Sequence, residues 1–293
     1  MVNIFDVADS VQDAIQRKDE VGLVKIAGQY RARDRYKVMR AYQHKYKTDL
    51  EDAIRKALKN GRSEDFCAYL WVTIPELRAE LIKKALNGKN DDNALIDLVI
   101  LCNAPHWNDT CVAYTRMYKK VLGDDLLSQL GTKTNWHHVF KHWIKHSRSP
   151  RYSVQADADQ YLAFLKAKNY EGIAQLLGTT VTEEYREIAK LVEEKLGTTI
   201  VSKIESTWNK LDCQVLLSAH YYMLHPARLA GYLLECATEK KGDERRVIRI
   251  SLTFDICLAA KFALRERGIE LQGRLRSAFD ERFATLAIAL WRA

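Results

Sequence analysis

The sequence has little proline and little glycine: 4 and 13 of its 293 residues. Both residue types are common in chains with many turns. The sequence also contains no long alternation of apolar and polar residues of the kind seen in strands. The scarcity of turn-forming residues therefore favours a mostly helical protein. Apolar residues make up 47% of the chain, enough to bury a sizeable core.

Long apolar runs are also absent. No segment approaches the roughly 18 apolar residues needed to span a bilayer as a helix. The first residues, MVNIFDVADS, contain neither a basic region nor an apolar signal segment, and Val2 excludes a Met-Gly myristoylation signal. No prenylation box ends the chain. We expect a soluble intracellular protein whose membrane contacts are peripheral.

The cysteine pattern excludes several kinds of site. No Cys-x-x-Cys pair occurs, and most cysteines stand in apolar helical stretches, where free buried thiols are expected. No nucleophile–base pair and no phosphate-binding cofactor loop can be recognised, so we do not expect an enzyme. The cysteines are Cys67, Cys102, Cys111, Cys213, Cys236 and Cys257.

What the chain does have is positive charge. Its formal net charge is +8 and its pI is about 9.0. This charge favours anionic partners: acidic lipid head groups, sulfated glycans, nucleic acid or acidic protein tails. Part of the charge serves solubility alone, and no motif for specific nucleic-acid recognition is present.

The most informative stretch is 75–101, PELRAELIKKALNGKNDDNALIDLVIL. Apolar residues at helical spacing predict two helices, and the polar segment 87–92 between them predicts a loop. The same unit returns from Pro226. Aligning Pro226 with Pro75 without a gap places Asp243 on Asp92.

A second recurring pattern, further along each unit, divides the chain into four repeats. Ala41-Tyr42 with Tyr46 and Leu50 matches Ala113-Tyr114 with Tyr118 and Leu122, and Val192, Leu196 and Ile200 fill the same places in a third copy. We predict repeats at 5–73, 75–146, 155–225 and 226–293, with a basic, polar linker at 147–154.

Four five-helix repeats that open with a helix–loop–helix resemble the annexins. The resemblance covers essentially the whole chain and rests on repeat length, on the Ile-Pro and His-Pro openings at 74–75 and 225–226, and on the Tyr-x-x-x-Tyr-x-x-x-Leu pattern. The stretches AYTRMYKK, CNAPHWNDT and KGDERR are most similar to the alpha-giardin branch. The resemblance implies an all-α fold: four repeats of five helices in one compact, slightly curved domain.

The resemblance also implies calcium binding. Annexins usually bind calcium through a Gly-x-Gly-Thr loop after the first helix of a repeat, completed by a distal Asp or Glu, and calcium takes about six to eight oxygens. Here the distal positions fall near Ala57, Gln129, Thr207 and Ser277, with Asp280 and Glu281 close to the last. We therefore expect weak, non-standard calcium sites. The candidate metal ligands are Gly88, Asn90, Asp91, Asp92, Lys240, Gly242, Asp243 and Glu244, and the candidate anion- or lipid-binding residues are Lys89, Lys240, Lys241, Arg245 and Arg246.

Each local signal also has a simpler interpretation. Asp91 or Asp92 can cap the following helix, with or without a cation. The basic residues around the fourth loop can form an ordinary solvated face. His138, His142 and His146 share one helical face, but no carboxylate or cysteine is interleaved with them. A basic, solvated face is therefore the favoured interpretation of these histidines over a transition-metal site.

By this resemblance we expect a non-enzymatic peripheral protein that binds acidic phospholipids with calcium and associates with the cytoskeleton at the inner face of the plasma membrane. The alternative is a structural cytoskeletal protein that binds microtubules or acidic tubulin tails, with weak or incidental calcium binding. The basic surplus and the missing distal acids favour the alternative.

Overall fold

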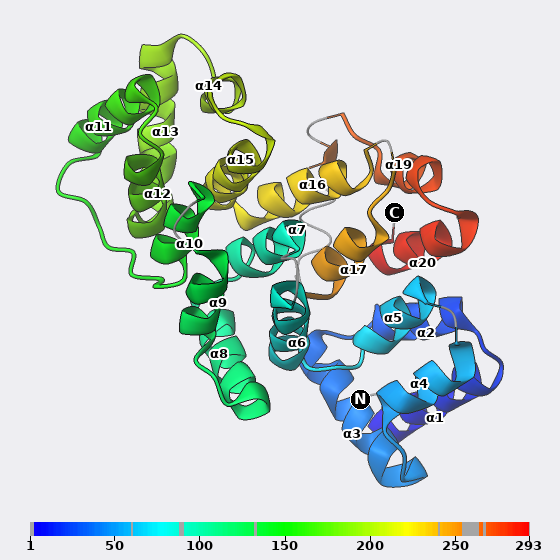
Figure 1. Cartoon of the computed structure of the whole chain (residues 1–293). Helices are drawn as coiled ribbons and strands as arrows, with labels where there is room; N and C mark the ends of the chain where they lie inside the picture. Colours follow the sequence, from blue (N-terminus) through cyan, green and yellow to red (C-terminus); the bar gives the residue numbers. More distant parts are fainter. Residues whose placement is uncertain are drawn as a thin grey trace. The chain divides into compact units, whose positions relative to one another are not determined.

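The computed structural model describes residues 3–59, 61–87, 91–131, 134–239, 241–253, 264–265 and 268–292. Within these ranges the chain folds into helices and contains no strand, only an isolated bridge between Ser149 and Thr180 (Figure 1). The predicted all-α fold is confirmed.

The first three predicted repeats each contain five helical segments. In the first these are α1 (Ile4–Gln16), α2 (Glu20–Ala27), α3 (Ala32–Tyr46), α4 (Leu50–Leu58) and α5 (Arg62–Tyr69). In the second they are α6 (Ile74–Leu86), α7 (Asp92–Leu95) continued by the π-helix η1 (Ile96–Ile100), α8 (Ala104–Tyr118), α9 (Leu122–Leu130) and α10 (Trp136–Trp143).

In the third repeat the helices are α11 (Val154–Ala167), α12 (Tyr170–Thr179), α13 (Thr182–Leu196), α14 (Ile200–Thr207) and α15 (Lys210–Leu224). The fourth repeat contains α16 (Pro226–Ala237), α17 (Glu244–Thr253), α19 (Leu271–Ala278) and α20 (Glu281–Trp291). The expected third helix of this repeat falls mainly on residues outside the described ranges.

The helices group into two compact units, Met1–Glu80 with Leu233–Ala293, and Leu81–Tyr232. The first unit combines the first and fourth repeats, and the second combines the second and third. The boundaries between these units do not coincide with the predicted linker at 147–154. Segment 147–154 lies inside the second unit, where the Ser149 amide donates to Thr179 O at 3.0 Å and the Arg151 amide donates to Glu184 Oε2 at 2.8 Å.

In the first unit, an ion pair joins residues from opposite ends of the chain. Arg282 Nε donates to Glu20 Oε2 at 2.7 Å and Arg282 Nη2 to Glu20 Oε1 at 2.5 Å, while Glu20 is buried. Nearby, the rings of Phe66 and Phe283 pack with their centroids 5.7 Å apart. The first and last repeats therefore share one core.

In the second unit, a chain of polar contacts runs through the apolar core of the third repeat. The hydroxyls of Tyr161 and Tyr185 lie 3.4 Å apart, and the Tyr185 hydroxyl lies 2.7 Å from His220 Nδ1. Burial, with a smaller contribution from Arg228, lowers the pKa of His220 to about 4. The imidazole is therefore neutral at physiological pH.

The structure corrects the gap-free alignment of the second and fourth repeats by one residue. The Asp91 amide donates to Ala85 O at 2.9 Å, and the Asp243 amide donates to Ala237 O at 2.8 Å. Asp243 thus corresponds to Asp91 rather than to Asp92. The starts of the preceding helices show the same one-residue shift: α6 begins one residue before its proline, whereas α16 begins at its proline.

Candidate functional site

The loop that opens each repeat ends in an Asp or Asn that caps the second helix. The cap oxygen accepts from the amide three residues later, at 2.8 Å for Asp19, 3.0 Å for Asp91, 2.9 Å for Asn169 and 2.9 Å for Asp243. Capping is therefore one role of Asp91 and Asp243. Each cap stabilises its helix by about 1 kcal/mol.

The loops differ in length between repeats. In the first and third repeats the cap amide bonds the carbonyl five residues earlier, Ala14 O and Phe164 O. In the second and fourth repeats it bonds the carbonyl six residues earlier, so these two loops are longer and carry more backbone carbonyls. Four predicted ligand or anion-binding residues lie outside the described residues: Gly88, Lys89, Asn90 and Lys240.

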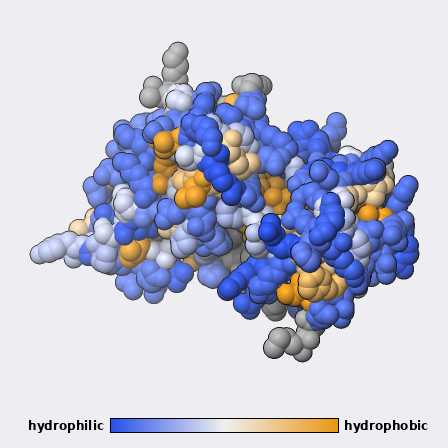
Figure 2. All heavy atoms as spheres, turned by 90° about the horizontal axis from the view of Figure 1, so that it is seen from below, coloured by the Kyte–Doolittle hydropathy of each residue, from blue (hydrophilic) through white to orange (hydrophobic). Residues whose placement is uncertain are grey.

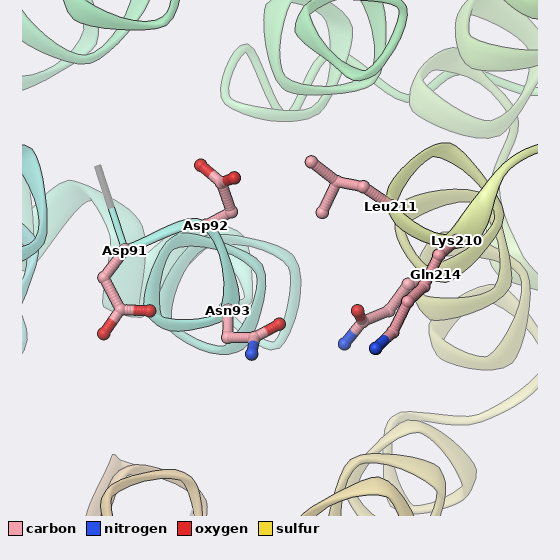
Figure 3. Close-up of a pocket in the computed structure, with 6 residues that line it drawn as sticks. All are labelled: Asp91, Asp92, Asn93, Lys210, Leu211 and Gln214. Atoms are coloured by element: carbon pink, nitrogen blue, oxygen red, sulfur yellow. The ribbon is translucent and has the colours of Figure 1, made fainter. Parts of the chain in front are cut away.

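The second-repeat loop borders a pocket of about 330 Å³ (Figure 3). Asp91, Asp92 and Asn93 line one side from the start of α7. Lys210, Leu211 and Gln214 line the other side from the start of α15. The pocket therefore combines hard oxygen donors with a cation, a combination that suits a cation together with its anionic ligand.

The start of α15 is held firmly at this pocket. Asp212 is 5% exposed, and its Oδ2 accepts from Asn135 Nδ2 and from Asn209 Nδ2, both at 2.9 Å. The Tyr170 hydroxyl donates to Asp212 O at 3.2 Å. Sequence reasoning did not predict Lys210 as part of the site, because its neighbours in the pocket are far away in sequence.

The fourth-repeat loop lies against the junction between α19 and α20. A Cβ on Gly242 would lie 2.6 Å from Ala278 O, so only glycine fits this approach. Burial raises the pKa of Glu244; Asp280 and Asp243 raise it further, while Arg62 opposes them. Asp280 caps α20, where its Oδ1 accepts from the Phe283 amide at 2.9 Å, and it comes from the region where the distal acid was expected.

The basic residues around this loop separate into exposed and buried ones. Lys241 and Arg245 are exposed. Arg246 is only 3% exposed and Arg249 only 5%. The prediction of Arg246 as a lipid-contacting residue is therefore wrong for this structure, since its side chain lies inside the first unit.

His138 and His142 of α10, and His146 beyond the end of this helix, are all partly buried and do not form the solvated face that was favoured. A Cβ on Gly178 of α12 would lie 2.5 Å from His142 Cβ, so α10 and α12 pack closely at this point. Burial, with a smaller contribution from Arg148, lowers the pKa of His146 to about 4. His138 Nδ1 lies 3.3 Å from Glu171 Oε1.

Among the residues that the structure describes, no three or more His, Cys, Asp and Glu side chains are grouped so that they could hold a metal ion. No helix in the same part of the chain is long and apolar enough to cross a membrane.

Comparison with known proteins identifies the family. Residues 5–67 match the family model for Annexin, and residues 230–292 match the model for the fourth repeat of Annexin E1. The chain is 47% identical to giardin subunit alpha-6 of Giardia intestinalis, over 100% of this chain and 99% of that protein. The chain belongs to the annexin family, in its alpha-giardin branch. The resemblance noted in the sequence is thereby confirmed.

Solved structures agree with this assignment. Calcium-bound alpha-1 giardin superposes on the chain with a TM-score of 0.94 at 36% identity, covering 99% of each chain. Annexin III superposes with a TM-score of 0.83 at 19% identity over 100% of this chain and 94% of that one, which shows a shared fold.

Proposed function

We propose that this annexin binds anionic phospholipid surfaces in a calcium-dependent manner, through the loops that open its second and fourth repeats. One observation carries the proposal: these two loops are the longer ones, and each ends in two consecutive acidic residues, Asp91-Asp92 and Asp243-Glu244. The calcium-bound structure of alpha-1 giardin supports it, because that relative shares the fold and 36% of the residues.

The donor chemistry fits calcium. Carboxylates and backbone carbonyls are the hard oxygen ligands that calcium takes, about six to eight at a time. Asp91 and Asp92 in one repeat, and Asp243, Glu244 and Asp280 in the other, supply carboxylates. Because no complete set is grouped among the described side chains, oxygens of lipid phosphate would complete the shell. Calcium would then bind weakly in water and more tightly at a membrane.

Basic side chains beside the loops strengthen this interaction. Lys210 lines the second-repeat pocket, and Lys241 and Arg245 are exposed next to the fourth-repeat loop. Each basic residue near an anionic membrane contributes about 1 kcal/mol. Salt screens these contributions, so binding should weaken as ionic strength rises.

The test compares pelleting of the protein with phosphatidylserine vesicles, with and without calcium. The double variant Asp91→Asn/Asp243→Asn keeps both helix caps, as Asn169 does naturally in the third repeat, but removes two charges. We expect it to lose the calcium effect and to bind equally or better without calcium. Asp19→Asn, the same change in a shorter loop, is the matched control and should behave like the unchanged protein. Equal calcium dependence in the double variant would refute the assignment of these loops.

The second candidate function is that of a structural cytoskeletal protein that binds microtubules, with weak or incidental calcium binding. The net charge of +8 favours an acidic partner such as the tails of tubulin. Co-sedimentation with microtubules, before and after removal of the tubulin tails, tests this function separately. Unchanged sedimentation without the tails would exclude the charge-based contact.

A further inference from the structure

One positively charged side chain of the second unit is partly buried instead of lying in solvent. In Figure 2 the visible face of the molecule is mostly hydrophilic, because charged side chains normally lie at the surface. Arg148 is an exception, since its Nε and Nη2 atoms are buried without a hydrogen-bond partner among the described residues. Burial lowers the pKa of this guanidinium, because it disfavours the charged form. An arginine nevertheless stays charged at physiological pH.

Two aromatic rings pack against Arg148. Its guanidinium carbon lies 4.4 Å from the centroid of the Trp143 ring and 6.0 Å from that of the Tyr222 ring, and the two rings lie 5.1 Å apart. Trp143 is fully buried and Tyr222 is buried. These cation–π contacts stabilise the positive charge. They supply no oxygen acceptor, however, so the N–H groups still lack the hydrogen bonds that they make in water.

Other buried or partly buried arginines show what Arg148 lacks. Arg35 Nη1 donates to Tyr30 O at 2.9 Å. Arg151 Nε, three residues after Arg148, lies 3.4 Å from Asp157 Oδ2. Within the described part of the chain, Arg148 makes neither a hydrogen bond nor an ion pair. A buried cation without an anion is unfavourable, so an anion that reaches the guanidinium should bind there.

One edge of this guanidinium is open to an anion. Nη1 is not one of the buried atoms of Arg148 and has no partner among the described residues, so solvent reaches it beside the buried Nη2. The backbone on both sides is fixed. His146 has a φ of 46°, which few residues other than glycine adopt, and the Ser149 amide donates to Thr179 O at 3.0 Å. Together with the contact to Trp143, this holds the Nη1–Nη2 edge in place and lowers the entropic cost of binding.

Two further buried atoms beside Arg148 lack partners among the described residues: Trp143 Nε1 and His146 Nε2. His146 lies close enough to Arg148 for the two side chains to interact electrostatically. We propose that Arg148 binds a phosphate group at its Nη1–Nη2 edge. A planar guanidinium donates two parallel hydrogen bonds to phosphate oxygens, and phosphate, unlike a carboxylate, has a third oxygen for another donor. This site contains no residue of the second- or fourth-repeat loops, so it is independent of calcium.

The experiment compares the full chain in sodium phosphate, glycerol phosphate and sodium chloride at equal pH and ionic strength. The variant Arg148→Met keeps an unbranched apolar stem against Trp143 and removes the charge. Lys145→Met removes an exposed charge from the same segment and is the matched control. Thermal unfolding followed by circular dichroism gives the Tm. The Nε–H signals of isotope-labelled arginine, followed by NMR, report contacts of individual guanidinium groups in the unchanged protein.

We expect phosphate to raise the Tm of the unchanged protein and of Lys145→Met above their values in chloride, and Arg148→Met to lose this rise. In chloride, Arg148→Met should melt at the same temperature as the unchanged protein or higher, because it removes a buried charge that has no partner. One arginine Nε–H signal should shift with phosphate, and this signal should be missing from the spectrum of Arg148→Met.

A phosphate response that is equal in the unchanged protein and in Arg148→Met would overturn the proposal. So would a lower Tm of Arg148→Met in chloride together with no shifted arginine signal in the unchanged protein, because Arg148 would then serve only to pack against Trp143. Vesicles of phosphatidic acid without calcium identify the source of the phosphate. If the phosphate response depends on Arg148, weaker pelleting of Arg148→Met assigns the site to a lipid head group, and equal pelleting assigns it to a soluble phosphate.

Discussion

Exchanging the cap residues of two repeats should move stability in opposite directions. Thr199 Oγ1 accepts from the Ser202 amide at 3.0 Å, whereas Val121 at the corresponding position offers no acceptor to α9. Val121→Thr keeps the side-chain shape and adds the acceptor. Since Val121 is 61% exposed, little apolar burial is lost. A cap of this kind contributes about 1 kcal/mol.

The assay is thermal unfolding followed by circular dichroism. For a domain of this size, about 1 kcal/mol corresponds to a change of roughly 2–4 °C in Tm. We expect Val121→Thr to raise Tm by this amount, Thr199→Val to lower it similarly, and the double variant to melt near the unchanged protein. A lower Tm for Val121→Thr would refute the reasoning, because it would show that the valine stabilises the chain itself.

Three further predictions concern buried charges. Arg282→Leu should cost about 1–3 kcal/mol in urea unfolding because it leaves the Glu20 carboxylate buried without its partner, and Glu20→Leu/Arg282→Leu should recover most of the loss. Since burial lowers the pKa of His146 to about 4 from an unfolded value near 6.5, stability should fall as pH drops from about 6.5 to 4, and His146→Asn should flatten that decline. Burial alone would raise the pKa of Asp125. Hydrogen bonds from Lys120, Tyr114 and Lys83 lower this pKa to about 2 instead. The unchanged protein should therefore be more stable than Asp125→Asn above about pH 4, and this difference in unfolding free energy should vanish as pH falls to 2. A difference that stays constant over this pH range would contradict the prediction.

Much of the fold could be predicted because the repeats reinforce one another. The apolar spacing of 75–101 and its copies indicates the helices, and the scarcity of proline and glycine indicates that few other elements exist. The caps at Asp91 and Asp243 follow from the same pattern. The alignment placed Asp243 one residue away from its true counterpart because it matched the two prolines. Helix α6 begins one residue before its proline, whereas α16 begins at its proline.

Burial and proximity across the fold could not be predicted from the sequence. Arg246 and Lys241 belong to one basic cluster in the chain, yet one is buried and the other exposed because the helix periodicity turns Arg246 inward. The sequence pattern of His142 and His146 suggests a solvated face, but α12 packs against His142 and the Trp107 ring lies 6.2 Å from the His146 ring. Lys210 and Asp92 line one pocket although they are far apart in the sequence, and the bond between Asn135 and Asp212 links their two repeats.

Calcium titration by calorimetry, with and without phosphatidylserine vesicles, tests the central claim most directly. If lipid phosphate completes the shell at the second- and fourth-repeat loops, calcium alone should bind weakly, with a Kd on the order of 10⁻⁴–10⁻³ M. Vesicles should tighten calcium binding at least tenfold, and Asp91→Asn/Asp243→Asn should remove that gain. Micromolar binding without lipid, or an affinity that vesicles leave unchanged, would contradict the account.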